Sequence, residues 1–199
     1  MKRLVKDPAA CSHPGNPVLA DLIYGWGNYG WSALDEYLAA CIDHTLSSDG
    51  PILECGSGLS TVVVGAVAKK RGRVHWVFEH TPEWTARVRK YLARFDISSV
   101  NLRTTPLKDY GDYCWYDLPL EQMPDDFSLV ICDGPPGITK GGRYGLVPVM
   151  KGRLKAGCTI LLDDADREGE LKIARLWGDQ FGVPFEVLGS KKPYIRMTL

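Results

Sequence analysis

The sequence predicts an α/β fold, a doubly wound and mostly parallel sheet of seven strands with an antiparallel hairpin at its C-terminal edge. Short apolar runs alternate with segments of helical periodicity between residues 52 and 181, and this alternation is typical of parallel sheets covered by helices. A glycine-rich turn follows the first apolar run. Two strand-like runs near the end of the chain, 185–188 and 194–198, flank a turn-forming segment, which predicts an antiparallel pair.

Periodicity, turn residues and cap residues place the other elements. Strands are expected at 52–55, 74–79, 100–104, 127–132, 158–162, 185–188 and 194–198, and helices at 18–24, 32–46, 60–70, 82–95, 146–154 and 168–181. Ser32 is the expected N-cap of the second helix, and Thr81 precedes Pro82 as the cap of the fourth. Residues 1–17 and 106–125 are expected to be irregular.

Length and composition limit the class of protein. The chain has 199 residues, 45% of them hydrophobic and 24% charged, which is enough for one domain with a substantial core. Its 24 basic and 24 acidic side chains balance, and this argues against a nucleic-acid partner. No apolar run is long enough to cross a membrane, and no hydrophobic segment follows the basic N-terminus, so neither a membrane span nor a signal peptide is expected.

The six cysteines form no C-x-x-C pair and show no metal-finger spacing. Cys55, Cys132 and Cys158 fall in predicted buried strands, where a free thiol acts as a small hydrophobe. Reduced thiols are typical of intracellular proteins, so we predict a cytoplasmic location.

The most informative stretch is 51–61, Pro-Ile-Leu-Glu-Cys-Gly-Ser-Gly-Leu-Ser-Thr. It predicts a strand, a tight turn and a helix, the start of a nucleotide-binding βαβ unit. Gly56 allows a sharp turn, and Gly58 lets backbone approach a ligand. An NAD-type oxidoreductase is one alternative. Two features argue against it: Thr61 replaces the third glycine of the dinucleotide fingerprint, and the carboxylate of Glu54 is poorly placed beside a pyrophosphate.

Acidic residues stand at four predicted strand ends. They are Glu54, Glu79, Asp133 and the pair Asp163–Asp164. The carboxyl ends of parallel strands meet at one edge, and ligands bind there at the topological switch point. These side chains are therefore expected to converge on one crevice. Glu79 follows Gly58 by 21 positions, close to the spacing of about 20 expected of a carboxylate that binds ribose hydroxyls.

Glu-Cys-Gly-Ser-Gly resembles the first motif of class I S-adenosylmethionine-dependent methyltransferases, and the resemblance covers residues 48–199. Asp133-Gly-Pro-Pro-Gly and Asp163-Asp-Ala-x-Arg resemble one bacterial branch of that group. The resemblance implies that residues 48–199 bind the cofactor and that 1–47 form an arm and helix covering the substrate side. The cofactor residues it implies are Glu54, Gly56, Ser57, Gly58, Ser60, Thr61, Glu79, His80, Leu107 and Asp133.

The acidic strand ends also resemble the metal site of catechol-type O-methyltransferases. That resemblance implies that Asp133, Asp163 and Asp164 hold a divalent cation such as Mg²⁺, which would bind a hydroxyl acceptor and lower its pKa. The alternative is that Asp133 positions the cofactor or acts as a base, and that Asp163 caps the next turn.

These resemblances imply methylation at oxygen of a small-molecule acceptor, with Asp133 as the catalytic group that faces it. Candidate substrate residues are Trp31, Tyr113, Trp115, Arg143, Tyr144 and Arg167, and Tyr116 is a further candidate for an aromatic pocket or lid. Arg143 and Arg167 would clamp an anionic substrate or form ion pairs with the aspartates. A cofactor-binding partner subunit without catalysis is a further alternative, and the aromatic N-terminal arm is a candidate surface for a homodimer.

Overall fold

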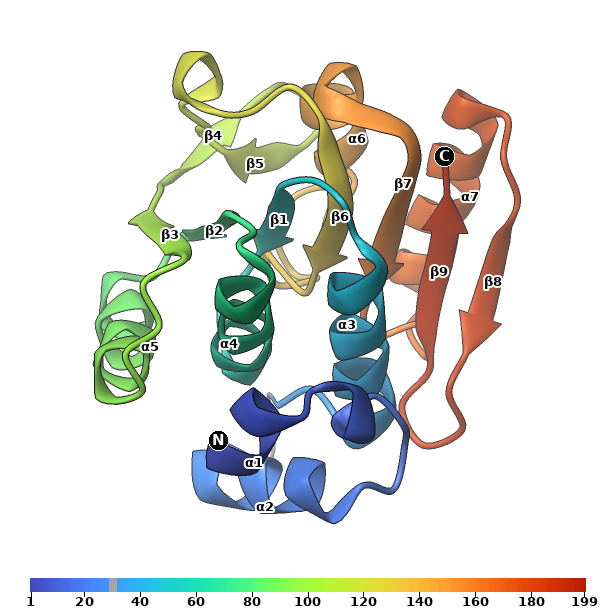
Figure 1. Cartoon of the computed structure of the whole chain (residues 1–199). Coiled ribbons are helices and arrows are strands. Elements are labelled where there is room, and N and C mark those ends of the chain that lie inside the picture. The colour runs from blue at the N-terminus through green and yellow to red at the C-terminus, as the bar shows by residue number, and fades with distance from the viewer. Residues whose placement is uncertain (29–31) are drawn as a thin grey trace.

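The computed structural model describes residues 1–28 and 32–199 and contains a seven-stranded sheet (Figure 1). The strand order is β3 (Val100–Thr104), β2 (His75–Glu79), β1 (Ile52–Cys55), β6 (Phe127–Cys132), β7 (Leu154–Leu162), β9 (Tyr194–Thr198) and β8 (Phe185–Leu188). The first five in this order pair in parallel, whereas β9 runs antiparallel to both β7 and β8. The predicted fold class is confirmed.

Helices cover both faces of the sheet, and two hydrophobic clusters fill the space between the layers. α3 (Asp35–Ser47), α4 (Leu59–Arg71) and α5 (Pro82–Arg94) cover one face. α6 (Leu146–Met150), α7 (Glu168–Phe181) and the small hairpin of β4 (Leu107–Asp109) and β5 (Cys114–Tyr116) pack on the other. Ile52 and Leu53 belong to different clusters, because successive side chains of a strand point to opposite faces.

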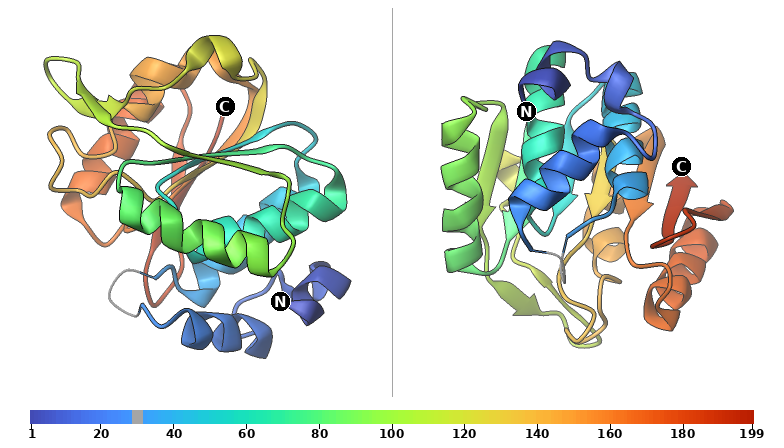
Figure 2. Two further views of the ribbon diagram at one scale, coloured as in Figure 1. Left: turned by 90° about the vertical axis from the view of Figure 1, so that its left-hand side faces the viewer. Right: turned by 90° about the horizontal axis from the view of Figure 1, so that it is seen from below.

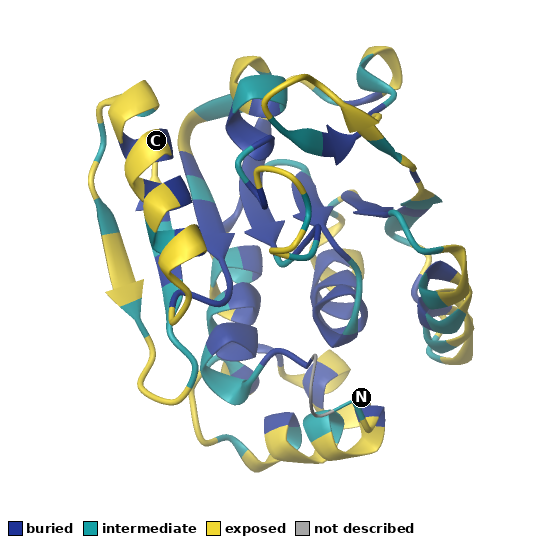
Figure 3. Ribbon diagram, turned by 180° about the vertical axis from the view of Figure 1, so that it is seen from behind, coloured by how far each residue is buried: buried dark blue, intermediate teal, exposed yellow. Residues whose placement is uncertain are grey.

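The burial of each helix follows from its place in these layers. All residues of α4 from Leu59 to Ala68 are buried, because α4 contacts β2 as well as α1 (Lys2–Lys6), α2 (Pro17–Trp26) and α3. A helix enclosed in this way is apolar on all sides. α7 buries Ile173, Ala174, Trp177 and Gly178 along one stripe. Figure 3 shows the contrast between the buried central strands and the exposed edge strand β8.

The N-terminal segment is more ordered than the sequence indicates. Residues 1–17 contain α1 and a 3-10 turn at Ala9–Cys11, and Leu4 and Cys11 are buried in the same cluster as α4. α1 packs against the end of α4, where Lys70 Nζ donates to the carbonyl oxygens of Val5 and Lys6, and α2 packs against α3 and α4. Both lie on the side of these helices that faces away from the sheet (Figures 1 and 2). The division at residue 47 stays a prediction.

The expected N-cap at Ser32 is wrong. α3 begins at Asp35 with Leu34 as its N-cap, and Ser32 lies buried before it. Both acidic residues that suggested a cap bind other segments. Asp35 accepts a hydrogen bond from Gly15 N, and Glu36 accepts from the backbone of Ser190 and Lys191 in the β8–β9 loop. Long-range contacts therefore decide where this helix begins.

Two other segments differ more than slightly from expectation. The predicted helix 146–154 is only α6 followed by a 3-10 turn at Lys151–Arg153, and β7 begins at Leu154, with a register shift opposite Phe127–Leu129. The segment 106–125 contains β4, β5 and a 3-10 turn at Leu120–Gln122. The boundaries of α7, β3, β6, β8 and β9 are as predicted.

All six cysteines are free, and Cys55, Cys132 and Cys158 are fully buried as predicted. Among the described residues, no helix has both the length and the apolar character needed to span a membrane.

Candidate active site

A cavity of about 690 Å³ lies at the carboxyl ends of the central strands. The loops after β1, β2, β6 and β7 form its floor, and the α2–α3 segment and the β8–β9 loop form its sides. The lining residues are Asn28, Ser32, Leu34, Gly56, Ser57, Glu79, His80, Thr81, Trp84, Tyr116, Asp133, Gly134, Pro135, Pro136, Arg143, Asp164, Asp166, Arg167, Lys191 and Lys192. Its volume falls within the usual range for small-molecule sites.

Two glycines bring the ends of β1 and β6 into backbone contact. Gly56 has a φ of +85°, and a Cβ there would lie 2.9 Å from the Gly134 nitrogen. A Cβ on Gly134 would lie 2.8 Å from the Gly56 Cα and 2.6 Å from the Tyr116 hydroxyl. Gly58 differs, because its φ is −179° and its Cβ position has no atom within 4 Å.

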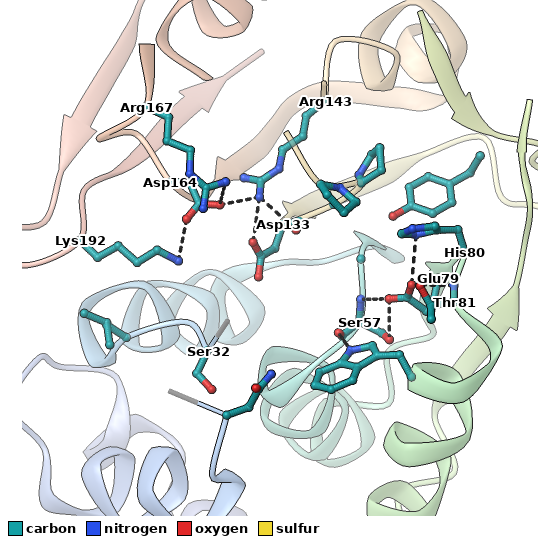
Figure 4. Close-up of a pocket in the computed structure, with 18 of the residues that line it drawn as sticks. Ser32, Ser57, Glu79, His80, Thr81, Asp133, Arg143, Asp164, Arg167 and Lys192 are labelled. Carbon is teal, nitrogen blue, oxygen red and sulfur yellow. Dashed lines mark hydrogen bonds and ion pairs between the residues drawn. The ribbon is translucent and has the colours of Figure 1, made fainter. Parts of the chain in front are cut away.

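Glu79, at the end of β2, joins the glycine turn to the start of α5. Its Oε2 accepts hydrogen bonds from the Ser57 backbone nitrogen at 3.0 Å and from the Ser57 hydroxyl at 3.1 Å. Its Oε1 accepts from Thr81 N at 2.9 Å and lies 3.2 Å from His80 Nδ1. Figure 4 shows these groups together on one wall of the cavity. The carboxylate is buried and held by backbone donors, so its position is set before any ligand binds.

Glu54 lies beneath the turn and outside the cavity lining. Its Oε1 accepts from the hydroxyls of Ser60 and Thr61 at 2.6 and 3.1 Å, and its Oε2 lies 2.8 Å from His75 Nε2. Thr61 Oγ1 in turn accepts from Gly58 N at 3.0 Å. Glu54, Ser60 and Thr61 therefore support the turn from the α4 side, and none of the three faces the cavity.

The acidic residues after β6 and β7 meet at the opposite wall. Asp133, Asp163 and Asp164 each place a carboxylate oxygen within 4.8 Å of the others. The fully buried guanidinium of Arg143 donates to Asp133 Oδ1 at 3.1 Å and to Asp164 Oδ2 at 2.6 Å. It also donates to the carbonyl oxygens of Asp133 and Asp163.

Two further cations complete this cluster (Figure 4). Lys192 Nζ lies 2.6 Å from Asp163 Oδ2 and 2.8 Å from Asp164 Oδ1, and Arg167 Nη1 lies 2.9 Å from Asp164 Oδ2. Because the three carboxylates are already matched by three fixed cations, the arrangement does not fit a bound divalent cation. Such an ion would have to displace Lys192 or Arg143 from carboxylate oxygens it needs as ligands.

The same environment shifts the pKa values of the three aspartates in different directions. Burial, together with the nearby Asp163, raises the pKa of Asp133 to about 8, although Arg143 and Lys192 oppose this rise. Burial also raises the pKa of Asp163. Burial alone would raise the pKa of Asp164 too, but Arg143 and Lys192 outweigh it and hold that pKa below its usual range. Asp133 is therefore the carboxyl group suited to exchange a proton near neutral pH.

Several solved structures with the same architecture are methyltransferases. A precorrin-6y C5,15-methyltransferase from Geobacter metallireducens GS-15 is 17% identical, over 85% of this chain and 90% of that chain, with a TM-score of 0.64. An O-methyltransferase from Bacillus cereus, solved in complex with SAH (S-adenosylhomocysteine), is 16% identical over 94% and 92%, with a TM-score of 0.63. A tRNA (m1A58) methyltransferase from Aquifex aeolicus is 13% identical over 90% and 75%, with a TM-score of 0.61.

The chain therefore has the class I methyltransferase fold. At these identities the likeness concerns the fold, and the three named proteins act on different acceptors. No protein-family model matches the sequence, and no curated protein matches it. The antiparallel β9 between β7 and β8 also departs from the order of an NAD-type sheet, whose strands continue in parallel.

The methyltransferase fold brings some predicted site residues together and leaves others apart. Gly56, Ser57, Glu79, His80, Asp133, Arg143, Asp164 and Arg167 line the cavity. Glu54, Gly58, Ser60, Thr61, Leu107, Tyr113, Trp115, Tyr144 and Asp163 are not part of its lining. Trp31 lies outside the described residues. Trp115 is fully buried, and Tyr113 packs edge-on against Tyr144 with ring centroids 5.4 Å apart. Trp115, in β5, belongs to the second hydrophobic cluster, and the partly buried Tyr113 and Tyr144 pack against that cluster.

Tyr116, a candidate for the aromatic pocket, does line the cavity, whereas the sequence analysis did not name the lining residues Trp84 and Lys192. Tyr116 is fully buried, and within the described residues no protein atom hydrogen-bonds its hydroxyl. Trp84 donates from Nε1 to the Ser57 carbonyl oxygen, and its place one turn into the helix after Glu79 was an available signal. Lys192 sits in a hairpin loop, and no sequence pattern links that loop to the acidic strand ends.

Proposed function

We propose that the protein is an S-adenosylmethionine-dependent methyltransferase that acts on an oxygen atom of a small molecule. The observation that carries this proposal is the placement of Glu79. Its buried carboxylate lies at the end of β2, bonded to a glycine turn, in a cavity at the switch point of a methyltransferase-type sheet. The described cavity lining presents no phosphate-binding glycine loop with a lysine, which suits a nucleoside cofactor without a phosphate.

Different cavity residues fit different parts of such a cofactor. Glu79 keeps lone pairs that can accept the two ribose hydroxyls, because an ionised carboxylate offers about four acceptor sites. His80 and Trp84 line the same part of the cavity and offer aromatic faces to a base. The buried, unpartnered Tyr116 hydroxyl is a further donor, and its neighbours are the His80 ring, with centroids 6.3 Å apart, and the backbone of Gly134.

When bound, the cofactor supplies an electrophilic methyl group. The task of the protein is to align the acceptor with it and to exclude water. Asp133 faces the cavity with about a quarter of its side chain exposed. With its pKa raised to about 8, Asp133 is ionised in part near neutral pH and fully above it, and this carboxylate form is a suitable acceptor for the hydroxyl proton. This proton-accepting group supports methylation at oxygen, and the size of the cavity supports a small acceptor.

The N-terminal residues 1–47 would act as a wall on the substrate side. Asn28, Ser32 and Leu34 line the cavity. The Arg87 guanidinium lies 4.9 Å from the ring centroid of Trp26 and 4.8 Å from that of Trp84, and this stack ties the end of α2 to α5. The homodimer stays a prediction.

The test is calorimetric titration with S-adenosylhomocysteine and separately with NAD, on the wild type and on Glu79→Ala. We expect micromolar binding of S-adenosylhomocysteine, weakened at least tenfold in the variant, and no binding of NAD. Asp49→Ala is the matched control, since Asp49 is exposed at the other end of the sheet. Binding of NAD alone would overturn the proposal. Cofactor binding without methyl transfer to a broad panel of acceptors would favour the partner-subunit alternative.

A further inference from the structure

The carboxylate cluster after β6 and β7 has the spacing of a cation site, and an amine of this chain already occupies it. The oxygens of Asp133, Asp163 and Asp164 lie within 4.8 Å of one another. Lys192 Nζ lies 2.6 and 2.8 Å from two of them. These are the distances of charge-assisted hydrogen bonds. Lys192 comes from the β8–β9 loop, 28 residues beyond Asp164 in the sequence.

We propose that Lys192 is a built-in cation that binds the acceptor oxygen, so that the protein needs no metal ion for methyl transfer. The proposal rests on the proposed function and adds to it the group that anchors the acceptor. The acceptor class that fits is a phenol or alcohol, whose oxygen takes a hydrogen bond from the ammonium group beside the carboxylate of Asp133.

Geometry favours Lys192 over the other two cations for this role. Arg143 is only 2% exposed, and its terminal nitrogens already donate to two carboxylates and two carbonyl oxygens. Arg167 is half exposed, and its Nη1 lies 2.9 Å from Asp164 Oδ2 and 3.8 Å from Glu170 Oε1. Lys192 lines the cavity with 22% of its side chain exposed. An ammonium group has three donors. One donates to Asp163 Oδ2, and the ammonium group also pairs with Asp164 Oδ1 at 2.8 Å, so donor capacity remains for a ligand in the cavity.

The resulting step balances without a metal ion or a redox partner. The acceptor oxygen forms a bond to the methyl carbon while the carbon–sulfur bond breaks. The electron pair of the broken bond stays on the sulfur, which becomes neutral. The acceptor proton passes to Asp133 in molecules in which that side chain is ionised. Lys192 keeps its own protons throughout, and its charge stabilises the negative charge that develops on the acceptor oxygen.

The first experiment asks whether Lys192 holds the cation position, and it requires no acceptor. MnCl₂ is titrated calorimetrically into the wild type, Lys192→Ala and Lys192→Arg. We expect no saturable Mn²⁺ binding to the wild type or to Lys192→Arg. Lys192→Ala should bind Mn²⁺ saturably, with a dissociation constant at least tenfold below any weak value found for the wild type, since the carboxylates lose a fixed cation but keep their spacing. Tight Mn²⁺ binding to the wild type that is lost in Asp163→Asn would overturn the proposal.

The second experiment asks whether Lys192 binds an acceptor oxygen. The probe is 4-nitrophenol, added to protein saturated with S-adenosylhomocysteine, because its phenol and phenolate forms absorb at different wavelengths. We expect the bound probe to shift toward phenolate in the wild type and in the control Lys155→Met, and to lose most of that shift in Lys192→Met. Lys155 is a lysine paired with Asp49 at the other end of the sheet.

These outcomes separate the inference from the proposed function. Equal phenolate shifts in the wild type and Lys192→Met, with S-adenosylhomocysteine bound by both, would overturn the role of Lys192 and leave the methyltransferase proposal standing. Failure of the wild type to bind S-adenosylhomocysteine would overturn the methyltransferase proposal and the acceptor role together. The Mn²⁺ titration would still decide whether Lys192 fills the cation position. Lys192→Arg keeps the positive charge and serves as the folded control for the neutral variants Lys192→Ala and Lys192→Met.

Discussion

The two walls of the cavity are built in different ways. At the Glu79 wall, backbone nitrogens and a hydroxyl from residues 57–81 satisfy one carboxylate. At the Asp133 wall, three carboxylates are balanced by the charged side chains Arg143, Arg167 and Lys192, which come from three separate loops. The first wall is local in the sequence, and the second depends on long-range ion pairs.

This difference suggests that the two walls have different roles, one in binding the cofactor and the other in proton exchange. A carboxylate held by backbone donors is rigid and stays ready to accept hydroxyl groups, as a cofactor requires. A cluster of buried charges has unequal proton affinities, so one member can exchange a proton while the others stay charged. The following predictions test this contrast, from the largest expected effect to the smallest.

The largest effect is expected at the ion-pair wall. Arg143→Met should lower the free energy of unfolding by about 3–5 kcal/mol, because it leaves buried carboxylates without their main partner. Arg167→Met is the matched control, and its loss should stay below about 1 kcal/mol, since Arg167 is half exposed. Urea unfolding of both variants measures the difference. Similar losses in the two would show that burial does not distinguish these arginines.

The glycine turn should separate stability from binding. Gly56→Ala should cost about 2–4 kcal/mol in unfolding free energy, because it combines a positive φ with a clash against the Gly134 backbone. Gly58→Ala should change stability by less than about 1 kcal/mol, as its backbone is extended and its Cβ position is open. If Gly58 faces the cofactor, its variant should still lose affinity for S-adenosylhomocysteine in a titration. Unchanged affinity would contradict a role for Gly58 in binding.

The pH dependence of stability should reveal Asp133. Between pH values of about 4 and 8, the folded state keeps a proton on Asp133 that the unfolded state has released, since the pKa is raised to about 8 on folding. Stability from this group is therefore lost as pH rises, with a slope of at most about 1.4 kcal/mol per pH unit. Asp133→Asn should flatten the slope in urea titrations at several pH values.

Asp164→Asn is the comparison for that measurement. The pKa of Asp164 is lowered on folding, so its stabilising contribution is present above a pH of about 4 and disappears only at lower pH. Its removal should leave the slope between pH 4 and 8 in place. A slope unaffected by Asp133→Asn would show that another group, such as Asp163, takes up the proton.

The smallest effect is expected for Tyr116→Phe. Loss of one hydrogen bond to the ligand should weaken S-adenosylhomocysteine binding about 3- to 10-fold. The ligand-free protein should be equally stable or slightly more stable, because the removed hydroxyl has no protein partner among the described residues. Tyr110→Phe, in the exposed loop between β4 and β5, should change neither quantity. A clear loss of stability in Tyr116→Phe would assign the hydroxyl a structural role.

Much of the fold followed from local patterns. The order of strands and helices, the C-terminal hairpin and the acidic strand ends could all be predicted from the sequence. Periodicity reports burial directly, and parallel strands carry their ends to one edge. Element boundaries were predicted less well where distant segments compete. α3 begins late because Asp35 and Glu36 bind Gly15 and the β8–β9 loop instead of capping the helix.

The sequence by itself determined which residue types would gather at the carboxyl edge of the sheet. Only the tertiary structure decided what each of them contacts. Glu54 and Glu79 both end strands, yet His75 and α4 enclose Glu54, whereas Glu79 borders the cavity. Arg143, Arg167 and Lys192 reach the same aspartates from separate loops. The reason is physical: the free energy of a buried charge depends on partners brought close by folding, and sequence spacing does not encode those distances.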